Sequence, residues 1–572
     1  MGEPVADAGM MARADAEGDA FSLPDFLDAA RTCLPNTPGC DDEPVPPTPA
    51  WNCGERCFVA TPEVSSSLVD AFGGPTDPDA SQAPRIVYPL EGALHPANLP
   101  EITLQWWRAR GDQQTLFHAH LAGTQTYDFY LPCRRPEWGP QEPVSPPPPQ
   151  EQCTYTLPEW LWKNVSAANK GHTLFLSIEG AQIAGGAVAR SQPVKLRFSP
   201  KSVMGGFYYW SSQDGTRTGV VSRMVFGGKK ATPFITPAST ANPTECGGCH
   251  SVSRNGMLIS LTTGTSRGSL YLGPTDNPGA PIVGSQAAVP ASMSSISPLG
   301  DLVLVSYDDR ATLSNGQLSV LRTADGALVT KLNPQAAGLT GKVFFPEWSP
   351  RGDSVSVTVS TNDVTPWSVL NGSIAVIPFK DSAFGKGRIV VPETTDLFHY
   401  YPTWSPDGEW IAFVSAKKQE GRSSYDNVDS RLRLVKVATG EVFDMRNASI
   451  GTDLTSTWPK FAPFQQDNNK LMFITFNSRA DYGFVVPNSI LPNSGWPQLW
   501  MAAINVGNLA PGQDPSSPPV WLPFQAPQQH NHLGFWTEQL RCRPDAPAGS
   551  VERCGAGEVC DADARRCYLP IE

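Results

Sequence analysis

The stretch Trp404–Ser415, which reads WSPDGEWIAFVS, decides the fold of this chain. It joins a tight Ser-Pro-x-Gly turn to a run of apolar residues, the pattern of a turn that leads into a buried strand. In most copies a further strand follows later, as in Ser373–Val376. Repeats of this length, with two or more strands each, are typical of β-propeller blades. The copies align on Ser253, Ser297, Ser349, Ser405 and Ala462, at spacings of 44, 52, 56 and 57 residues.

The number of blades follows from the same alignment. Five turns give five inner strands, and His532–Thr537 supplies a sixth, because Trp536-Thr537 aligns with Trp404-Ser405. Its outer strands would come from the beginning of the region, Gly206–Trp210 and Val220–Phe226. A blade built from both chain ends leaves no exposed edge strand. We therefore predict a six-bladed β-propeller over residues 203–540.

The W-S-P-D-G-x-x-I-A-F pattern of residues 404–413 resembles the blades of TolB and related periplasmic propellers, which carry WD40-like (PD40) repeats. The resemblance covers about residues 203–537. It implies the propeller fold and an envelope location. It implies little about activity, because propellers host many functions.

The rest of the chain divides into three further segments. Residues 1–82 are acidic and then proline-rich, which predicts a flexible tether with small disulfide loops. Residues 83–200 hold short strand-like runs between turns, which predict an immunoglobulin- or fibronectin III-like β-sandwich. Residues 541–572 hold four cysteines and predict a two-disulfide appendage, for which three connectivities remain possible. The predicted fold class is all-β.

Charge and cysteine content limit the partners and the compartment. The formal net charge is −12 and there is no basic block, so we expect no nucleic-acid partner. No apolar run approaches the 18 residues or so that a membrane-spanning helix needs. Ten of the 12 cysteines look like disulfide partners, which favours the periplasm or the cell surface over a cytosolic protein with reduced thiols. The start resembles a mature lipoprotein after signal removal, so a lipid anchor is possible there.

The sequence Cys246-Gly247-Gly248-Cys249-His250 is a C-x-x-C-H motif, the attachment signature of c-type haem. Two thiols at this spacing can bond both vinyl groups of one porphyrin, and the adjacent His250 can bind the iron as its proximal ligand. We predict one covalent haem c held by Cys246 and Cys249. A redox disulfide, a plain structural bridge and a zinc knuckle are the alternatives for this cysteine pair.

A sixth iron ligand should come from a neighbouring blade. The repeat alignment places Met293 at the position of Cys249 and His532 one residue away from that level in the closing blade. His532 is the first candidate for the distal ligand and Met293 the second, with His399 at a similar level farther round the ring. A vacant sixth position is the further alternative. His118 and His120 look like ordinary strand alternation.

The motifs of hydrolases, phosphate-binding loops and zinc proteases do not occur, so no catalytic residue is assigned. The expected function is single-electron transfer by an extracytoplasmic haem protein that docks a redox partner or an envelope protein. A non-catalytic scaffold of the TolB type is one alternative. A peroxidase-like haem enzyme, with an open iron position and an acid–base residue beside it, is another.

Overall fold

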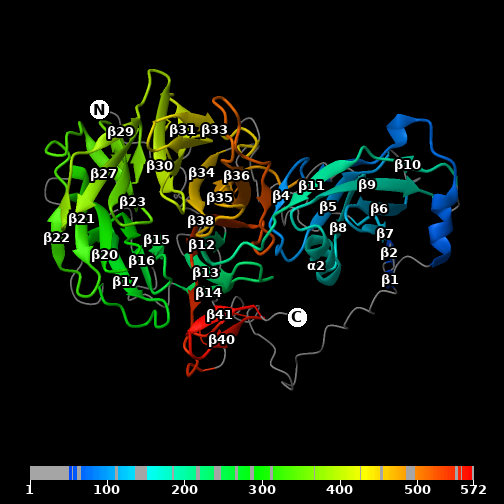
Figure 1. The fold of residues 1–572 in the computed structure, drawn as a ribbon, viewed down its shortest axis with the longest axis horizontal. Coiled ribbons are helices and arrows are strands. Elements are labelled where there is room, and N and C mark those ends of the chain that lie inside the picture. Colours follow the sequence, from blue (N-terminus) through cyan, green and yellow to red (C-terminus); the bar gives the residue numbers. More distant parts are fainter. Residues whose placement is uncertain are drawn as a thin grey trace, which may run out of the picture.

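The computed structural model of the chain shows a nearly all-β protein, which confirms the predicted fold class (Figure 1). A β-sandwich, a β-propeller and a small C-terminal sheet follow one another along the sequence. The described residues are 51–53, 56–60, 66–109, 114–134, 151–182, 186–213, 219–236, 247–263, 268–283, 289–309, 314–365, 367–420, 422–425, 427–450, 455–484, 496–547, 550, 552–555 and 557–569.

The sandwich packs a large sheet against a small one. Its core includes Trp106 of the small sheet, whose ring centroid lies 5.1 Å from that of Phe117 in the large sheet. In the described part of the chain the large sheet runs β1 (Trp51–Cys53), β2 (Arg56–Ala60), β7 (Thr126–Pro132), β6 (Leu116–Ala122), β9 (Thr173–Ala181), β11 (Val194–Phe198) and β4 (Leu94–His95), with β10 (Ala189–Arg190) beside β9. The small sheet holds β3 (Arg85–Tyr88), β5 (Thr103–Trp107) and β8 (Gln152–Thr156).

The sandwich differs from the immunoglobulin-like expectation in two respects. Two of its strand pairs, β2 with β7 and β11 with β4, are parallel. A helix, α2 (Glu159–Ala168), follows β8 and buries Leu161, Trp162 and Val165 against the core. The helix was not predicted, because its apolar residues stand in a short stretch between two strands and resemble a strand run.

The strands also begin earlier than residue 83, where we expected the tether to end. β2 pairs with β7 throughout Arg56–Ala60. The 3₁₀ helix η1 (Ser66–Gly73) then packs Val69, Ala71 and Phe72 against Leu116 and Tyr130, and η2 (Ala80–Gln82) leads into β3. The apolar residues of this segment follow no helical or strand period, so no sequence signal predicted an element here. They are partly buried because the large sheet lies beneath them.

Six sheets make up the propeller in the described part of residues 203–540 (Figure 1). Each runs outward from an inner strand through antiparallel pairs of strands. The first sheet holds β38 (Gln529–Thr537), β12 (Gly206–Gln213), β13 (Gly219–Val225) and β14 (Thr232–Ile235), and the second holds β15 (Gly247–Val252), β16 (Leu258–Thr263), β17 (Gly268–Pro274) and β18 (Pro290–Ala291). The third sheet holds β19 (Met293–Ile296), β20 (Leu302–Asp309), β21 (Ser314–Arg322) and β22 (Leu328–Lys331), and the fourth holds β23 (Lys342–Trp348), β24 (Ser354–Ser360), β27 (Ser373–Lys380) and β29 (Arg388–Val391), with β28 (Ala383–Phe384) beside β27. The fifth sheet holds β30 (Leu397–Trp404), β31 (Trp410–Lys417), β32 (Arg431–Lys436) and β33 (Val442–Asp444), and the sixth holds β34 (Ser456–Phe461), β35 (Leu471–Ser478), β36 (Gln498–Asn505) and β37 (Val520–Trp521). A hairpin of β25 (Asp363–Thr365) and β26 (Ser368–Val369) projects from the fourth sheet.

The first sheet combines the two ends of the region, as the repeat alignment predicts. β12 pairs antiparallel with β38, from Gly206 opposite Thr537 to Gln213 opposite Gln529. β38 in turn contacts β15 on one side and β34 on the other. The last inner strand therefore lies between the second and sixth sheets.

The Ser-Pro-x-Gly turns are stabilised by the serine itself. In the fourth sheet Ser349 donates through Oγ to Asp353 at 2.8 Å and accepts from the amide of Ser354 at 3.2 Å. The glycine of each turn has a positive φ, which is 74° at Gly408 and 70° at Gly256. Such a backbone favours glycine.

These two glycines should respond differently to alanine. Both substitutions place a Cβ in left-handed backbone, which costs about 1–2 kcal/mol. At Gly256 the new Cβ would also lie 2.0 Å from the carbonyl oxygen of Gln539, whereas at Gly408 the nearest atom is a side-chain atom 3.3 Å away. We expect Gly256→Ala to lower the free energy of unfolding by about 1–3 kcal/mol more than Gly408→Ala does. Urea unfolding of both variants measures this; equal losses would contradict it.

The sandwich contacts the propeller directly (Figure 1). Gln105 of β5 donates to the carbonyl oxygen of Tyr482 at 3.1 Å, and the amide of Trp521 donates to the Tyr88 hydroxyl at 3.2 Å. The rings of Tyr482 and Trp521 stack 4.2 Å apart. The hydrophobic core is continuous across this contact.

The C-terminal segment forms the predicted disulfide-linked appendage. Its sheet holds β39 (Leu540–Arg541), β41 (Arg566–Tyr568) and β40 (Val559–Asp561). Of the three possible connectivities the structure has Cys542–Cys560 and Cys554–Cys567. Cys133 is bonded to Cys153 in the sandwich. Cys53 and Cys57 lie opposite each other in the register of β1 and β2, and the predicted pair Cys33 and Cys40 lies outside the described residues.

Candidate functional site

The inner strands line the central channel with residues at equivalent repeat positions. Cys249 and Met293 belong to a layer that continues with Phe345, Tyr401, Trp458 and Leu533. Two residues farther along each strand lies a second layer, formed by Ser251, Ser295, Glu347, Thr403, Lys460 and Phe535. A group held by the motif would therefore lie among the residues of these two layers.

Five strands have the same kink at the first layer. Cys249, Phe345, Tyr401, Trp458 and Leu533 have φ values of 50°, 52°, 53°, 51° and 58°. The ladders to the neighbouring strands shift register at these places. β19 pairs with β20 through Met293 without such a shift. Left-handed backbone is unfavourable for non-glycine residues, so its repetition shows that packing around the channel imposes it.

Aromatic rings fill the first layer. Tyr401 and Trp458 stack with centroids 3.7 Å apart, and Phe345 meets Tyr401 edge-on at 4.5 Å. The cavity that remains beside Cys249, His250 and these rings is about 30 Å³. The sequence analysis did not single out these rings. The aromatic-proline pairs Phe345-Pro346, Tyr401-Pro402 and Trp458-Pro459, each just before a Ser-Pro or Ala-Pro turn, are the signal that could have found them.

An ion pair crosses the channel in the second layer. Lys460 of β34 pairs with Glu347 of β23, and the Thr403 hydroxyl donates to the same carboxylate at 2.6 Å. The Lys460 ammonium also lies 4.6 Å from the ring centroid of Phe535. Glu347, Lys460 and Phe535 line both the cavity beside Cys249 and a second cavity at the turn end of the channel, so this network separates the two cavities.

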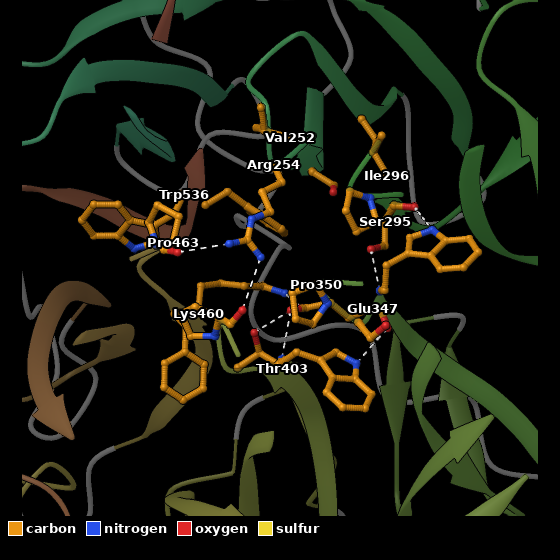
Figure 2. A pocket seen from close by; sticks show the side chains of 18 of the residues that line it. Val252, Arg254, Ser295, Ile296, Glu347, Pro350, Thr403, Lys460, Pro463 and Trp536 are labelled. Carbon is orange, nitrogen blue, oxygen red and sulfur yellow. Dashed lines mark hydrogen bonds and ion pairs between the residues drawn. The ribbon is translucent and has the colours of Figure 1, made fainter. Parts of the chain in front are cut away.

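The turn end of the channel holds a second cavity, of about 120 Å³ (Figure 2). Arg254 reaches across it to the carbonyl oxygen of Pro463 at 3.3 Å and pairs with Glu538 at 2.6 Å. Arg254 and Glu538 stand where the other turns have proline, as in Pro350. The charged pair thus links the second blade to the strand that comes from the end of the region.

His250 is buried, with 1% of its surface exposed. Neither ring nitrogen has a hydrogen-bond partner of ordinary geometry among the described residues. Burial lowers its pKa to about 3, with a small further lowering by Lys460 and an opposing influence of the Tyr208 backbone. The imidazole is therefore neutral at physiological pH, which is the state in which histidine binds a metal.

The two predicted distal ligands occupy different places near His250. Met293 is buried and lines the same cavity as Cys249 and His250. His532 packs its ring 4.5 Å from the ring of Trp210, outside the lining of that cavity. Burial lowers the pKa of His532 to about 3, and the nearby His530 and His250 lower it further.

The other histidines of the propeller are less suited to this role. His399 is buried and its Nδ1 lies 2.8 Å from the Ser415 hydroxyl, and the linings of both channel cavities leave it out. The ring centroid of His530 lies 4.3 Å from that of Trp496.

Cys246 lies outside the described residues, so the structure places Cys249 and His250 of the motif and not its first thiol.

The residues present match a haem in their donor chemistry. A neutral, buried imidazole follows directly on Cys249, with no hydrogen-bond partner of ordinary geometry in the part of the chain that the structure describes. A methionine and a second neutral histidine are near. The volume of the cavity beside the motif is less favourable for a haem. Binding sites for small molecules usually measure about 300–1,000 Å³, and the cavity beside the motif is far smaller. A porphyrin therefore does not fit inside this cavity with the side chains as they stand.

The inner strands, the paired ends and the repeated turns define a β-propeller protein. No protein-family model matches the chain, and no curated protein sequence does.

Several solved structures are similar to this chain at low sequence identity. TolB from Acinetobacter baumannii is 13% identical with a TM-score of 0.36, over 62% of this chain and 80% of that one. A putative TolB from Agrobacterium tumefaciens is 15% identical with a TM-score of 0.30, over 58% and 98%. An oligogalacturonate lyase in complex with manganese is 13% identical with a TM-score of 0.32, over 51% and 70%. These similarities concern the fold alone.

The disulfides bear on the predicted extracytoplasmic location of the protein. The described disulfides fit an extracytoplasmic protein. Among the described residues no helix has the length and apolar character to span a bilayer.

Proposed function

We propose that this chain is an extracytoplasmic c-type haem protein in which Cys246 and Cys249 hold one haem covalently and His250 binds its iron. The observation that supports this most strongly is the state of His250, which is buried and neutral, and whose ring nitrogens have no hydrogen-bond partner of ordinary geometry among the described residues. Leaving both nitrogens of a buried imidazole unpaired is unfavourable, and a bound metal would satisfy one of them.

The chain's own residues would position and shield this site. The left-handed backbone at Cys249 turns the thiol and the following imidazole out of the regular strand alternation. The rings of Phe345, Tyr401 and Trp458 line the cavity beside Cys249 and would shield a group held there. A haem with two strong axial ligands supplies one-electron redox chemistry. Docking of a redox partner or an envelope protein on the outer faces would complete the function.

The absorption spectrum of protein made in a host with haem-attachment machinery tests this proposal. We expect a Soret band, and a covalent haem that stays with the chain after denaturation in acid acetone. Cys249→Ala should abolish the two-bond attachment, whereas Cys133→Ala, in the sandwich, should leave it intact. A wild-type protein without a Soret band would refute the proposal.

The same spectrum separates the candidates for the distal ligand. Loss of the low-spin form in His532→Ala, with Met293→Ala unchanged, would assign the ligand to His532. The reverse result would assign it to Met293, with a higher potential expected for a thioether ligand. A high-spin iron that binds cyanide in the wild type would favour the peroxidase-like alternative.

A scaffold that binds envelope proteins is the second candidate. It is supported by the closed channel, whose cavities of about 30 and 120 Å³ are too small for an ordinary small-molecule substrate. A propeller closed in this way presents its outer surfaces instead. Affinity capture from the envelope by a protein without haem would favour this function.

A further inference from the structure

The large sheet of the sandwich contains a cluster of titratable residues that the haem proposal does not use. His118 and His120 lie two residues apart on β6, so their side chains are on the same face of the sheet. Asp128 of β7 stands directly opposite His120 in the register. His118 and Asp128 are buried, while the His120 side chain keeps 27% of its surface exposed.

The ligand atoms of these three residues converge. His118 Nε2 lies 2.9 Å from Asp128 Oδ1, and His120 Nδ1 lies 2.8 Å from the same oxygen. One ligand atom of each of the three residues lies within 4.8 Å of those of the other two. Tetrahedral zinc with nitrogen and oxygen ligands at about 2.0–2.1 Å needs ligand atoms about 3.3 Å apart. An opening of about half an ångström would therefore admit the ion.

The surroundings of His118 are those of a metal ligand. Its other nitrogen, Nδ1, lies 2.6 Å from Glu179 Oε2 of β9, and Arg190 pairs with that glutamate. The imidazole also stacks on Tyr130 at 4.5 Å. Histidines that bind metals usually donate their second nitrogen to a carboxylate, which fixes the tautomer and the orientation of the ring. Glu179 can serve this purpose for His118.

We propose that His118 Nε2, His120 Nδ1 and Asp128 Oδ1 bind a divalent transition-metal ion, with zinc as the best match. Two imidazoles and one carboxylate are ligands that zinc accepts in sites with an open fourth position. The exposed side of His120 allows water to occupy that position. The site lies in the sandwich and is independent of the C-x-x-C-H motif in the propeller.

Two carboxylates face the imidazoles of the cluster. Asp128 approaches both histidines from β7, and Glu179 approaches His118 from β9. These oxygens are hard donors that suit a divalent cation together with imidazole nitrogen.

Calorimetric titration of metal-free, full-length protein with zinc chloride, under non-reducing conditions, tests the proposal. We expect one zinc ion per chain with micromolar affinity or better. His120→Ala and Asp128→Asn should weaken binding at least about 100-fold, and Glu179→Gln about 10–100-fold. His172→Ala, which removes an exposed histidine of the same domain, should leave binding unchanged.

Two results would overturn the proposal. One is the absence of zinc binding by the wild type at 100 µM metal, in which case the cluster is an ion network without a metal. The other is unchanged affinity in His120→Ala, which would place any bound zinc elsewhere. Thermal melting of the metal-free variants shows whether they fold. If Asp128→Asn does not fold, the test depends on His120→Ala, because the His120 side chain is partly exposed. Zinc binding should persist in Cys249→Ala, so this test and the haem test fail independently.

Discussion

Arg223→Met should loosen the C-terminal appendage from the propeller and lower the free energy of unfolding by about 3–5 kcal/mol. Arg223 is 2% exposed and donates to the carbonyl oxygens of Thr275, Arg541 and Arg553 at 3.1, 3.2 and 3.0 Å. Its guanidinium also lies 4.2 Å from the ring centroid of Phe234. Methionine keeps the volume but leaves the three carbonyl oxygens without this donor, and that of Thr275 is fully buried. Unpaired buried polar groups are costly.

Thermal melting and limited proteolysis measure this effect. Because both disulfides of the appendage are internal to it, a cut near Leu540 should release residues 541–572 as a discrete fragment. Arg322→Met is the matched control, because Arg322 is exposed and pairs only locally with Asp325. Melting and cleavage of Arg223→Met equal to those of the wild type would show that the appendage is held by other contacts.

Glu347→Ala should destabilise the propeller by about 3 kcal/mol, because it leaves the Lys460 ammonium in the channel without its counter-charge. The side chains of Lys460 and Glu347 are only 16% and 18% exposed. The Thr403 hydroxyl would also lose its acceptor. Removing one partner of a buried ion pair is more harmful than replacing both by apolar groups.

A double-mutant cycle tests this interpretation. We expect Lys460→Met to be destabilising as well, and the double variant Glu347→Ala/Lys460→Met to lose clearly less stability than the sum of the single variants. Urea unfolding of the four proteins gives the coupling. Additive losses would show that the two charges contribute independently and that the pair does not stabilise the channel.

The repeated turn was sufficient to predict the propeller. Trp404–Ser415 and its copies combine a turn that favours glycine with a buried run, and both signals are local. Their spacing also indicated that Gly206–Trp210 pairs with His532–Thr537, because an incomplete sixth copy needs outer strands. The C-x-x-C-H motif can likewise be recognised from the sequence alone, because its chemistry depends on the spacing of three nearby residues.

Other features depend on residues far apart in the chain. The pairing of Glu347 with Lys460 and the contact of Arg254 with Glu538 join different blades. Although Arg254 and Glu538 replace the proline of the other turns, no local pattern indicates which distant residue each of these side chains contacts.

His118 and His120 show the same limit most clearly. Alternation on a strand predicted their common face, and so the sequence alone indicated an ordinary strand. Only the register of β6 against β7 and β9 brings Asp128 and Glu179 to the two imidazoles. The sequence by itself therefore determined the repeats, the blade pattern and the haem motif, because local turn chemistry and periodicity encode them. The channel network and the His–Asp cluster were decided by the tertiary structure, because strand register and blade packing select which distant side chains meet.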